Sequence, residues 1–399
     1  MSALSPELVT EILLRLPVSS LLRFRCLSTS LCSEIDSENF VTSHLNRSIQ
    51  TKTRQKLIVY NPRFKGPSGF YYADFDDDLV DAFPLNKPLI SRHRGTSVYG
   101  SCNGLILLGM DFKVKSMDLA IWNPFTRRYK SLPPCPVQTL PEHRGFMSSG
   151  LGYDSAHDDY KIVIISKVHD SNRVFSQVWV FGLKSDFWRR SRDLEDEVTT
   201  SVGRFANGAL YWVCKNKVVG FDVAKEVFFD IPLLAECAPA AFFFDSFDSL
   251  VVFGGNLYFR KLHGETVEFY LLVSDVSDVS DKGGEEVVGV SWRKEFTLHE
   301  LFPLWPLAYS KDGDSVLIGD LSGVFWHNLE NKTNQRVNIP KVPKFFLFGH
   351  RYNVCWESLV SVGKDSAFDG AAEEMRVDDL DEEVEQLEAD IEQFEADIF

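Results

Sequence analysis

Histidine and aspartate are the residues of this chain best suited to chemistry, and they are most concentrated at His157-Asp158-Asp159. An imidazole beside two carboxylates is a donor set that a divalent metal ion could bind. The triplet lies between Tyr153-Asp154 and the apolar run YKIVI, where acidic residues favour a turn before a strand. We therefore interpret it as a turn and predict neither a metal site nor a cofactor.

The sequence also lacks the common motifs of catalysis. It contains no HExxH, no GxSxG, no P-loop and no Cys/His nucleophile motif. Its seven cysteines are odd in number and form no CxxC pair, which favours free thiols in a reducing compartment. We predict a protein without catalytic residues, located in the cytoplasm, the nucleus or both.

Most of the net negative charge lies at the C-terminal end of the chain. The formal net charge is −15, and residues 364–399 contain 15 acidic and 2 basic residues. The rest of the chain is therefore nearly neutral. It shows no basic stripe that would attract nucleic acid and no apolar run long enough to span a bilayer. We predict that neither nucleic acid nor a membrane is a partner.

Residues 4 to 45 have the pattern of short helices joined at corners. Ser5 can cap a first helix that has Pro6 at its first position. Pro17 ends this helix, because proline removes a hydrogen bond and clashes with the preceding turn. The helical positions are Leu8, Val9, Ile12, Leu13 and Leu16 on the first helix, Leu21, Leu22, Arg25 and Cys26 on the second, and Leu31, Cys32 and Ile35 on a third that Ser28 caps. Phe40 and Leu45 follow the third helix.

From Lys56 to about Val362 the pattern changes to short β-branched and aromatic runs separated by turn residues. Asn-Gly and Asp-Gly pairs introduce several runs, and such pairs supply the positive φ of tight hairpins. The units recur at roughly 40 to 55 residues, the range of four-stranded propeller blades. We count about six, with a degenerate first unit at Leu57–Leu89 and a ring closure by KFFLFGHRYNVCWESLV. A β-sandwich or an irregular barrel is the alternative.

The C-terminal tail has a heptad pattern. Its apolar residues are separated alternately by three and four positions, at Val377, Leu380, Val384, Leu387, Ile391, Phe394 and Ile398. Acidic residues fill most other positions, so self-pairing would bring carboxylates together. The tail is either a helix that pairs with a basic partner or a frayed, solubilising segment.

The first 45 residues resemble the F-box. The pattern is long and specific, and the matching residues are Leu4, Pro6, Glu7, Leu8, Val9, Ile12, Leu13, Arg15, Leu16, Pro17, Leu21, Leu22, Arg25, Cys26, Ser28, Ile35 and Phe40. Two positions depart from the family: Ser5 stands where a proline is usual, and Leu31 where a tryptophan is usual.

The β region resembles the F-box-associated domain of plant F-box proteins, which is kelch-like. The segments that carry this resemblance are SCNGLILL, IWNPFTRRYKSLP, GLGYDSAHDDYKIV and VFGLKSDFWRR, in that order. The expected fold is therefore an α+β multidomain chain: a small three-helix F-box, an all-β propeller-like domain and an acidic helical or disordered tail. The expected boundaries are 1–45 for the F-box, 46–56 for a linker, 57–362 for the β domain and 363–399 for the tail.

The resemblance implies the substrate-recognition subunit of a Skp–cullin–F-box ubiquitin ligase, which promotes degradation of a protein bound by the β domain. A unit of 45 residues buries little apolar surface by itself, so the helices of a Skp-type adaptor would cover it and link it to a cullin. Otherwise the same side chains pack on the β domain. The expected adaptor contacts are Leu4, Pro6, Leu8, Val9, Ile12, Leu13, Leu16, Pro17, Leu21, Leu22, Arg25, Cys26, Leu31 and Ile35.

Two other functions remain open. An interaction scaffold that has lost ligase coupling is compatible with Ser5 and Leu31. A propeller enzyme, such as a sugar-acting oxidase or hydrolase, would need acids, histidine or tyrosine gathered at the central channel. Substrate would dock on loops at one rim of the β domain. The segments at Arg127-Arg128, Trp188-Arg189-Arg190 and Phe302–Trp305 are suitable, but they read equally well as strand ends and packing aromatics.

Overall fold

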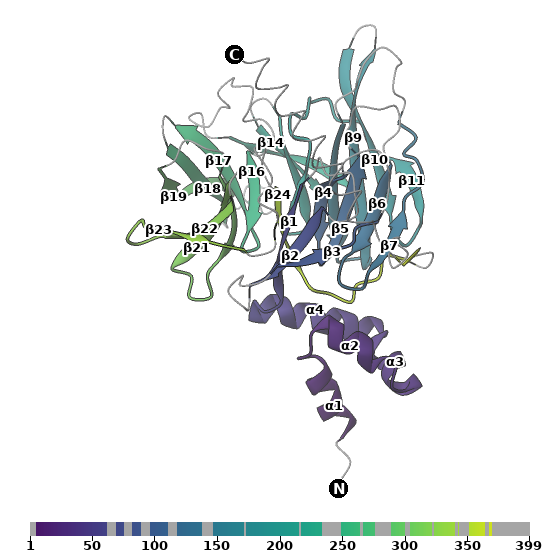
Figure 1. Ribbon diagram of the computed structural model, residues 1–399. Helices are drawn as coiled ribbons and strands as arrows, with labels where there is room; N and C mark the ends of the chain where they lie inside the picture. The colour runs from purple at the N-terminus through teal and green to yellow at the C-terminus, as the bar shows by residue number, and fades with distance from the viewer. Residues whose placement is uncertain are drawn as a thin grey trace, which may run out of the picture.

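The computed structural model describes residues 5–61, 69–75, 82–88, 96–110, 118–137, 147–170, 173–214, 217–233, 249–263, 266–275, 289–299, 304–320, 323–339, 342, 351–363 and 367–368. Within these residues a helical N-terminal unit lies against one side of a β-propeller, with the first helix farthest from it (Figure 1). Leu4 and the heptad pattern from Val377 fall outside the described residues.

The helical unit contains four helices among the described residues, not the three expected. They are α1 (Pro6–Leu13), α2 (Val18–Phe24), α3 (Thr29–Ile35) and α4 (Glu38–Thr51). Serine side chains cap three of them, because Ser5, Ser28 and Ser37 each accept a hydrogen bond from the backbone N–H three residues later. Pro17 is the N-cap of α2. Helix α1 ends at Leu13, so Leu16 lies outside it, and Arg25 and Cys26 follow the end of α2.

Helix α4 takes the place of most of the linker expected at 46–56. It continues to Thr51 and ends at Lys52, whose φ is 52°. Strand β1 (Gln55–Tyr60) then starts three residues later. The helix was missed because its buried face includes polar residues: Phe40, His44, Leu45 and Ser48 are buried together. A histidine and a serine on that face hide the apolar period by which helices are recognised.

The described strands form six antiparallel sheets, each a blade of the propeller. Their innermost strands contact the innermost strands of the next blades around the centre. The first blade contains β24 (Arg351–Trp356), β1, β2 (Phe70–Asp74) and β3 (Ala82–Leu85). The second contains β4 (Thr96–Cys102), β5 (Leu105–Met110), β6 (Leu119–Asn123) and β7 (Arg128–Ser131), to which β25 (Ala367–Phe368) adds an outer strand.

The remaining four blades follow in chain order. The third contains β8 (Met147–Asp154), β9 (Asp159–Asp170), β10 (Arg173–Gly182) and β11 (Phe187–Arg190), and the fourth β12 (Arg204–Ala206), β13 (Ala209–Val213), β14 (Lys217–Asp222) and β15 (Val227–Pro232). The fifth contains β16 (Leu250–Phe253), β17 (Asn256–His263), β18 (Thr266–Asp275) and β19 (Gly289–Leu298), and the sixth β20 (Trp305–Tyr309), β21 (Ser315–Asp320), β22 (Gly323–Asn328) and β23 (Asn334–Val337). The propeller prediction is confirmed, and the sandwich and barrel alternatives are excluded.

The ring closes as the sequence indicated. Strand β24, from the predicted closing segment, pairs antiparallel with β1 from Gln55↔Trp356 to Tyr60↔Arg351. The first blade therefore combines strands from both ends of the domain. The predicted hairpin turns are also confirmed at Asn103-Gly104 and Asn207-Gly208, where all four residues have positive φ.

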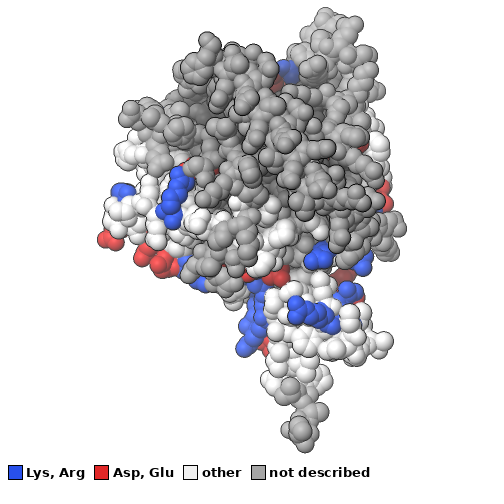
Figure 2. All heavy atoms as spheres, viewed as in Figure 1, with Lys and Arg blue, Asp and Glu red and all other residues white. Residues whose placement is uncertain are grey.

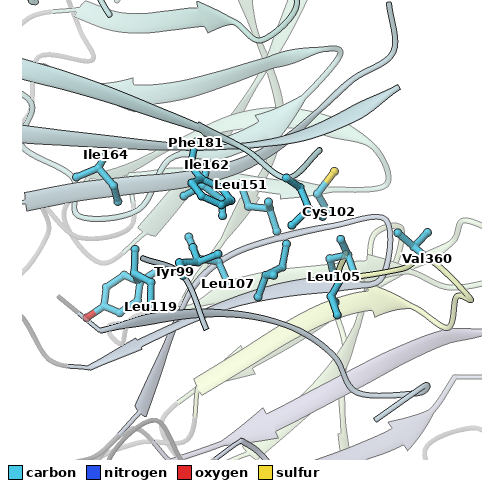
Figure 3. Close-up of a cluster of buried hydrophobic side chains, with 14 of the residues drawn as sticks. Tyr99, Cys102, Leu105, Leu107, Leu119, Leu151, Ile162, Ile164, Phe181 and Val360 are labelled. Atoms are coloured by element: carbon cyan, nitrogen blue, oxygen red, sulfur yellow. The ribbon is translucent and has the colours of Figure 1, made fainter. Parts of the chain in front are cut away.

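The core lies between neighbouring blades, because both faces of each inner strand are covered. Figure 3 shows the cluster between the second and third blades, with Tyr99, Leu107 and Leu119 facing Ile162, Ile164 and Phe181. Leu45 of α4 belongs to this same cluster, and Val41 packs against it. The fourth helix is therefore part of the propeller's core as well as of the helical unit.

Candidate functional site

The helical unit has a small core of its own. Leu13, Leu21, Ile35 and Phe40 are buried together, one from each helix. His44 is fully buried beside them, and its Nε2 lies 2.9 Å from the carbonyl oxygen of Leu16 at the corner between α1 and α2. Burial lowers the pKa of His44, so the neutral imidazole is favoured in the folded protein.

An apolar surface remains on the side of α1 that faces away from this core. Leu8 and Ile12 are 51% and 46% exposed, and they lie four residues apart on one helical face. Leu27, between α2 and α3, is 68% exposed. The described part of the helical unit also shows wide uncharged areas around its Lys and Arg side chains in Figure 2. Leu8 and Ile12 form an exposed apolar pair on one helical face, and such exposed apolar surface is typical of a protein-binding site.

The structure divides the expected adaptor contacts into three groups. The exposed group contains Pro6, Leu8, Ile12, Pro17 and Cys26. The partly buried group contains Val9, Leu16, Leu22, Arg25 and Leu31. The third group, Leu13, Leu21 and Ile35, is buried in the core of the helical unit. Sequence reasoning did not select Leu27, because a leucine in a turn belongs to no helical stripe.

Arg25 and Leu31 have local partners as well. The Arg25 guanidinium lies 2.6 Å from the Asp36 carboxylate, which joins the end of α2 to the end of α3. Leu31, at the position where the family usually has tryptophan, packs against the core of the helical unit. Ser5 caps α1. Both departures from the family pattern are therefore accommodated within the helical fold.

The His157 cluster is the turn that its sequence indicated, joining β8 to β9. The buried carboxylate of Asp154 accepts hydrogen bonds from the backbone N–H groups of Ala156 and His157 and lies 2.8 Å from His157 Nδ1. Lys161 Nζ lies 2.6 Å from the same carboxylate. Across the described residues, no group of three or more His, Cys, Asp or Glu is arranged to hold a metal ion.

The side chains proposed for substrate loops are largely engaged within the propeller. Trp188 donates a hydrogen bond of 2.7 Å to the carbonyl oxygen of Pro133 in the preceding blade. Arg189 pairs with Glu226 of the next blade, and Arg190 pairs with Asp193. Trp305 lies under the Arg351 guanidinium, at 5.4 Å from ring centroid to Cζ, and Phe302 is outside the described residues. The packing interpretation therefore accounts for Trp188 and Trp305. Arg127 and Arg128, at the turn between β6 and β7, are instead exposed.

Six of the cysteines lie in the described residues, and all six are free thiols. Burial raises the pKa of the Cys214 thiol to about 12, so it is a poor nucleophile at neutral pH. None of the helices among the described residues is long and apolar enough to cross a bilayer.

Comparison with known families matches both parts of the chain. Residues 1–43 match the F-box domain, and residues 77–356 match the F-box associated beta propeller domain. The second match covers most of the propeller and more than half of the chain.

The chain is also similar to curated F-box proteins. F-box protein CPR1 of Arabidopsis thaliana is 28% identical over 382 residues, which cover 87% of each chain. F-box protein At4g22390 of the same plant is 35% identical over 192 residues, 46% of this chain and 45% of that one. Among solved structures, TolB from Acinetobacter baumannii is 11% identical with a TM-score of 0.39, covering 80% of this chain and 73% of that one.

The F-box match covers the helical unit, and the propeller match covers most of the β domain that follows it. The relatives are plant F-box proteins, which agrees with these two matches. The chain therefore belongs to the plant F-box proteins in which an F-box domain precedes an F-box associated beta propeller domain.

Proposed function

We propose that this protein is the substrate-recognition subunit of a Skp–cullin–F-box ubiquitin ligase, acting in the cytoplasm, the nucleus or both. Its F-box would bind a Skp-type adaptor and, through it, a cullin. Its propeller would bind the protein that is ubiquitinated. The chain would contribute no catalytic residue, because holding a substrate near the ubiquitin-loaded enzyme raises the effective concentration of the reactants.

The observation that carries this proposal is the exposed apolar face of α1. Leu8 and Ile12 lie in a helical unit whose own core is already complete without them. Fully burying each side chain against an adaptor would contribute ~1.5–3 kcal/mol before the cost of association. The buried Leu13, Leu21 and Ile35 would act indirectly, because their packing in the core of the helical unit holds α1 in position.

The experiment is a titration of the full-length protein with a Skp-type adaptor, followed by calorimetry. We expect Leu8→Asp and Ile12→Asp each to weaken binding by roughly 10- to 100-fold, because each places a charge in the contact and removes its apolar burial. The matched control is Ile49→Asp, since Ile49 of α4 is 38% exposed but outside the proposed face.

Equal affinity of the wild-type chain and Ile49→Asp, with the expected loss of affinity in the two α1 variants, would support the proposal. Equal loss in all three variants would show that the α1 face is not the contact. Failure of the wild-type chain to bind any Skp-type adaptor would contradict ligase coupling and favour an interaction scaffold.

A further inference from the structure

The chain segment that follows the closing strand β24 reaches back to the helical unit. Glu357 comes directly after β24, and its carboxylate is buried. Its Oε1 accepts a hydrogen bond of 2.8 Å from the backbone N–H of Val18, the first residue of α2. The preceding Pro17 provides no side-chain cap, so an acceptor 339 residues away satisfies this buried donor.

The same carboxylate is fixed from the propeller side. Glu357 Oε2 lies 3.4 Å from Nζ of Lys56 on β1, and Lys56 also pairs with Asp74 on β2. The Lys56 side chain is only 8% exposed. The Lys56 ammonium pairs with both carboxylates, and this buried ion pair holds the Glu357 side chain in place. Its backbone N–H in turn donates to the carbonyl oxygen of Arg54, at 3.0 Å.

The next residues alternate between the two domains. Leu359 packs against the core of the helical unit, beside the cluster of Leu13 and Leu21. Val360, which Figure 3 shows, and Val362 are buried in the propeller cluster between the second and third blades. One short segment therefore belongs to both hydrophobic cores.

The second blade fixes the backbone of this segment. The Asn123 side-chain amide donates to the carbonyl oxygens of Ser358 and Val360, at 3.0 and 2.9 Å. Ser358 Oγ donates to the carbonyl oxygen of Asn103, at 2.9 Å. All these groups are buried or partly buried, where hydrogen bonds are costly to break.

We propose that residues 357–362 form a clamp that fixes the orientation of the F-box on the propeller, with Glu357 and Leu359 as its positioning residues. The clamp joins the helical unit to the closed ring through a carboxylate and an apolar side chain that are two residues apart in the same segment. In a ligase, the clamp would fix the distance between the adaptor and the bound substrate. This consequence rests on the proposed function, whereas the clamp itself is independent of it.

Hydrogen–deuterium exchange of the full-length protein tests the role of Glu357. We expect Glu357→Ala to raise exchange in peptides of α2 by roughly 5- to 30-fold, the effect of losing one or two kcal/mol of local stability. Exchange in the fourth and fifth blades should stay unchanged. Glu357→Gln keeps a carbonyl oxygen for the Val18 N–H and should show a smaller rise. Glu195→Ala, at an exposed carboxylate of the propeller, is the matched control.

Pulsed electron paramagnetic resonance tests the orientation. Nitroxides on ketone-bearing amino acids at Ser33 of α3 and Lys225 of the fourth blade would leave all cysteines in place. We expect one narrow distance distribution in the wild type and in Glu195→Ala. It should broaden in Leu359→Ala and broaden further in Leu359→Ala/Glu357→Ala.

Local loosening of α2 with a broader distance distribution would support the clamp. Unchanged exchange and distances, or exchange that rises equally throughout the propeller, would overturn it. The same proteins are then titrated with a Skp-type adaptor. If the wild-type protein does not bind the adaptor, the proposed function is contradicted but the clamp is not, because the exchange and distance measurements involve no adaptor.

Discussion

At the scale of single residues, the acids and histidine that look most reactive in the sequence serve the propeller's structure. Asp154 and Glu226 lie on neighbouring blades, and Lys161 Nζ lies 2.6 Å from one carboxylate and 2.8 Å from the other. Burial of Asp154 opposes its ionisation, but hydrogen bonds from Lys161 and His157 outweigh this and lower its pKa to about 2. A carboxylate with so low a pKa is stably ionised, unlike a general acid at neutral pH.

Replacing Asp154 should therefore destabilise the fold in a pH-dependent way. A lowered pKa in the folded state gives stability that is complete above about pH 4 and is lost as the pH falls toward 2. We expect Asp154→Asn to lower the free energy of unfolding by about 2 kcal/mol at pH 7, and by less at pH 3. Urea unfolding at pH 7, 4 and 3 measures this.

Asp193→Asn is the control for this experiment, because Asp193 forms a surface pair with Arg190 and should cost less than about 1 kcal/mol. A difference between Asp154→Asn and wild type that stays constant from pH 7 to pH 3 would show that the charge of Asp154 does not stabilise the fold.

At the scale of elements, two turns with the same Asn-Gly sequence differ in how closely other residues approach their glycines. Asn103-Gly104 and Asn207-Gly208 both adopt positive φ. A Cβ on Gly104 would lie 2.3 Å from Ser358 Oγ and 2.5 Å from the carbonyl oxygen of Trp356, whereas a Cβ on Gly208 would meet nothing within 4 Å. The first turn therefore supports the clamp segment, and the second only reverses the chain.

Gly104→Ala and Gly208→Ala should separate backbone strain from this close approach. Gly208→Ala should cost about 1–2 kcal/mol, the penalty of a left-handed alanine. Gly104→Ala should cost clearly more, ~3 kcal/mol or above, because the backbone around Trp356 and Ser358 must also move. Thermal and urea unfolding give both values. Equal destabilisation by the two variants would mean that the segment adjusts freely around Gly104.

At the scale of the whole molecule, the ring and the helical unit depend on the same C-terminal residues. Strand β24 completes the first blade, and the segment after it reaches the F-box core. A propeller that is not closed leaves an unpaired β1 edge and exposes the apolar faces of two blades. Closure should therefore stabilise both domains together.

A pair of truncations tests this dependence. A chain ending after residue 350 lacks β24 and the clamp, and we expect it to aggregate or to unfold at least 10 °C below the full chain, a shift of several kcal/mol for a domain of this size. A chain ending after residue 368 retains every described element and should unfold within ~2 °C of the full chain. Differential scanning calorimetry compares them. A cooperative, native-like transition in the shorter chain would show that closure by β24 is dispensable.

The sequence by itself determined the local features of this protein. Ser5, Ser28, Pro17, the Asn-Gly turns and the repeated strand pattern depend on neighbours in the chain, so they predicted the starts of the first three helices, the hairpins and a ring of about six blades. The F-box pattern likewise located the unit that carries the α1 face. Helix α4 escaped prediction because its buried face includes the polar residues His44 and Ser48, and the contact of His44 with the carbonyl oxygen of Leu16 exists only in the folded unit.

Only the tertiary structure decided which apolar residues stay exposed and how the two domains are joined. Leu8 and Leu13 look equivalent in the sequence, yet the first is half exposed and the second lies in the core. Glu357 and Val18 are 339 residues apart, and no local pattern links them. Burial and long-range hydrogen bonds depend on where the ring brings distant segments together, and sequence periodicity carries no information about that.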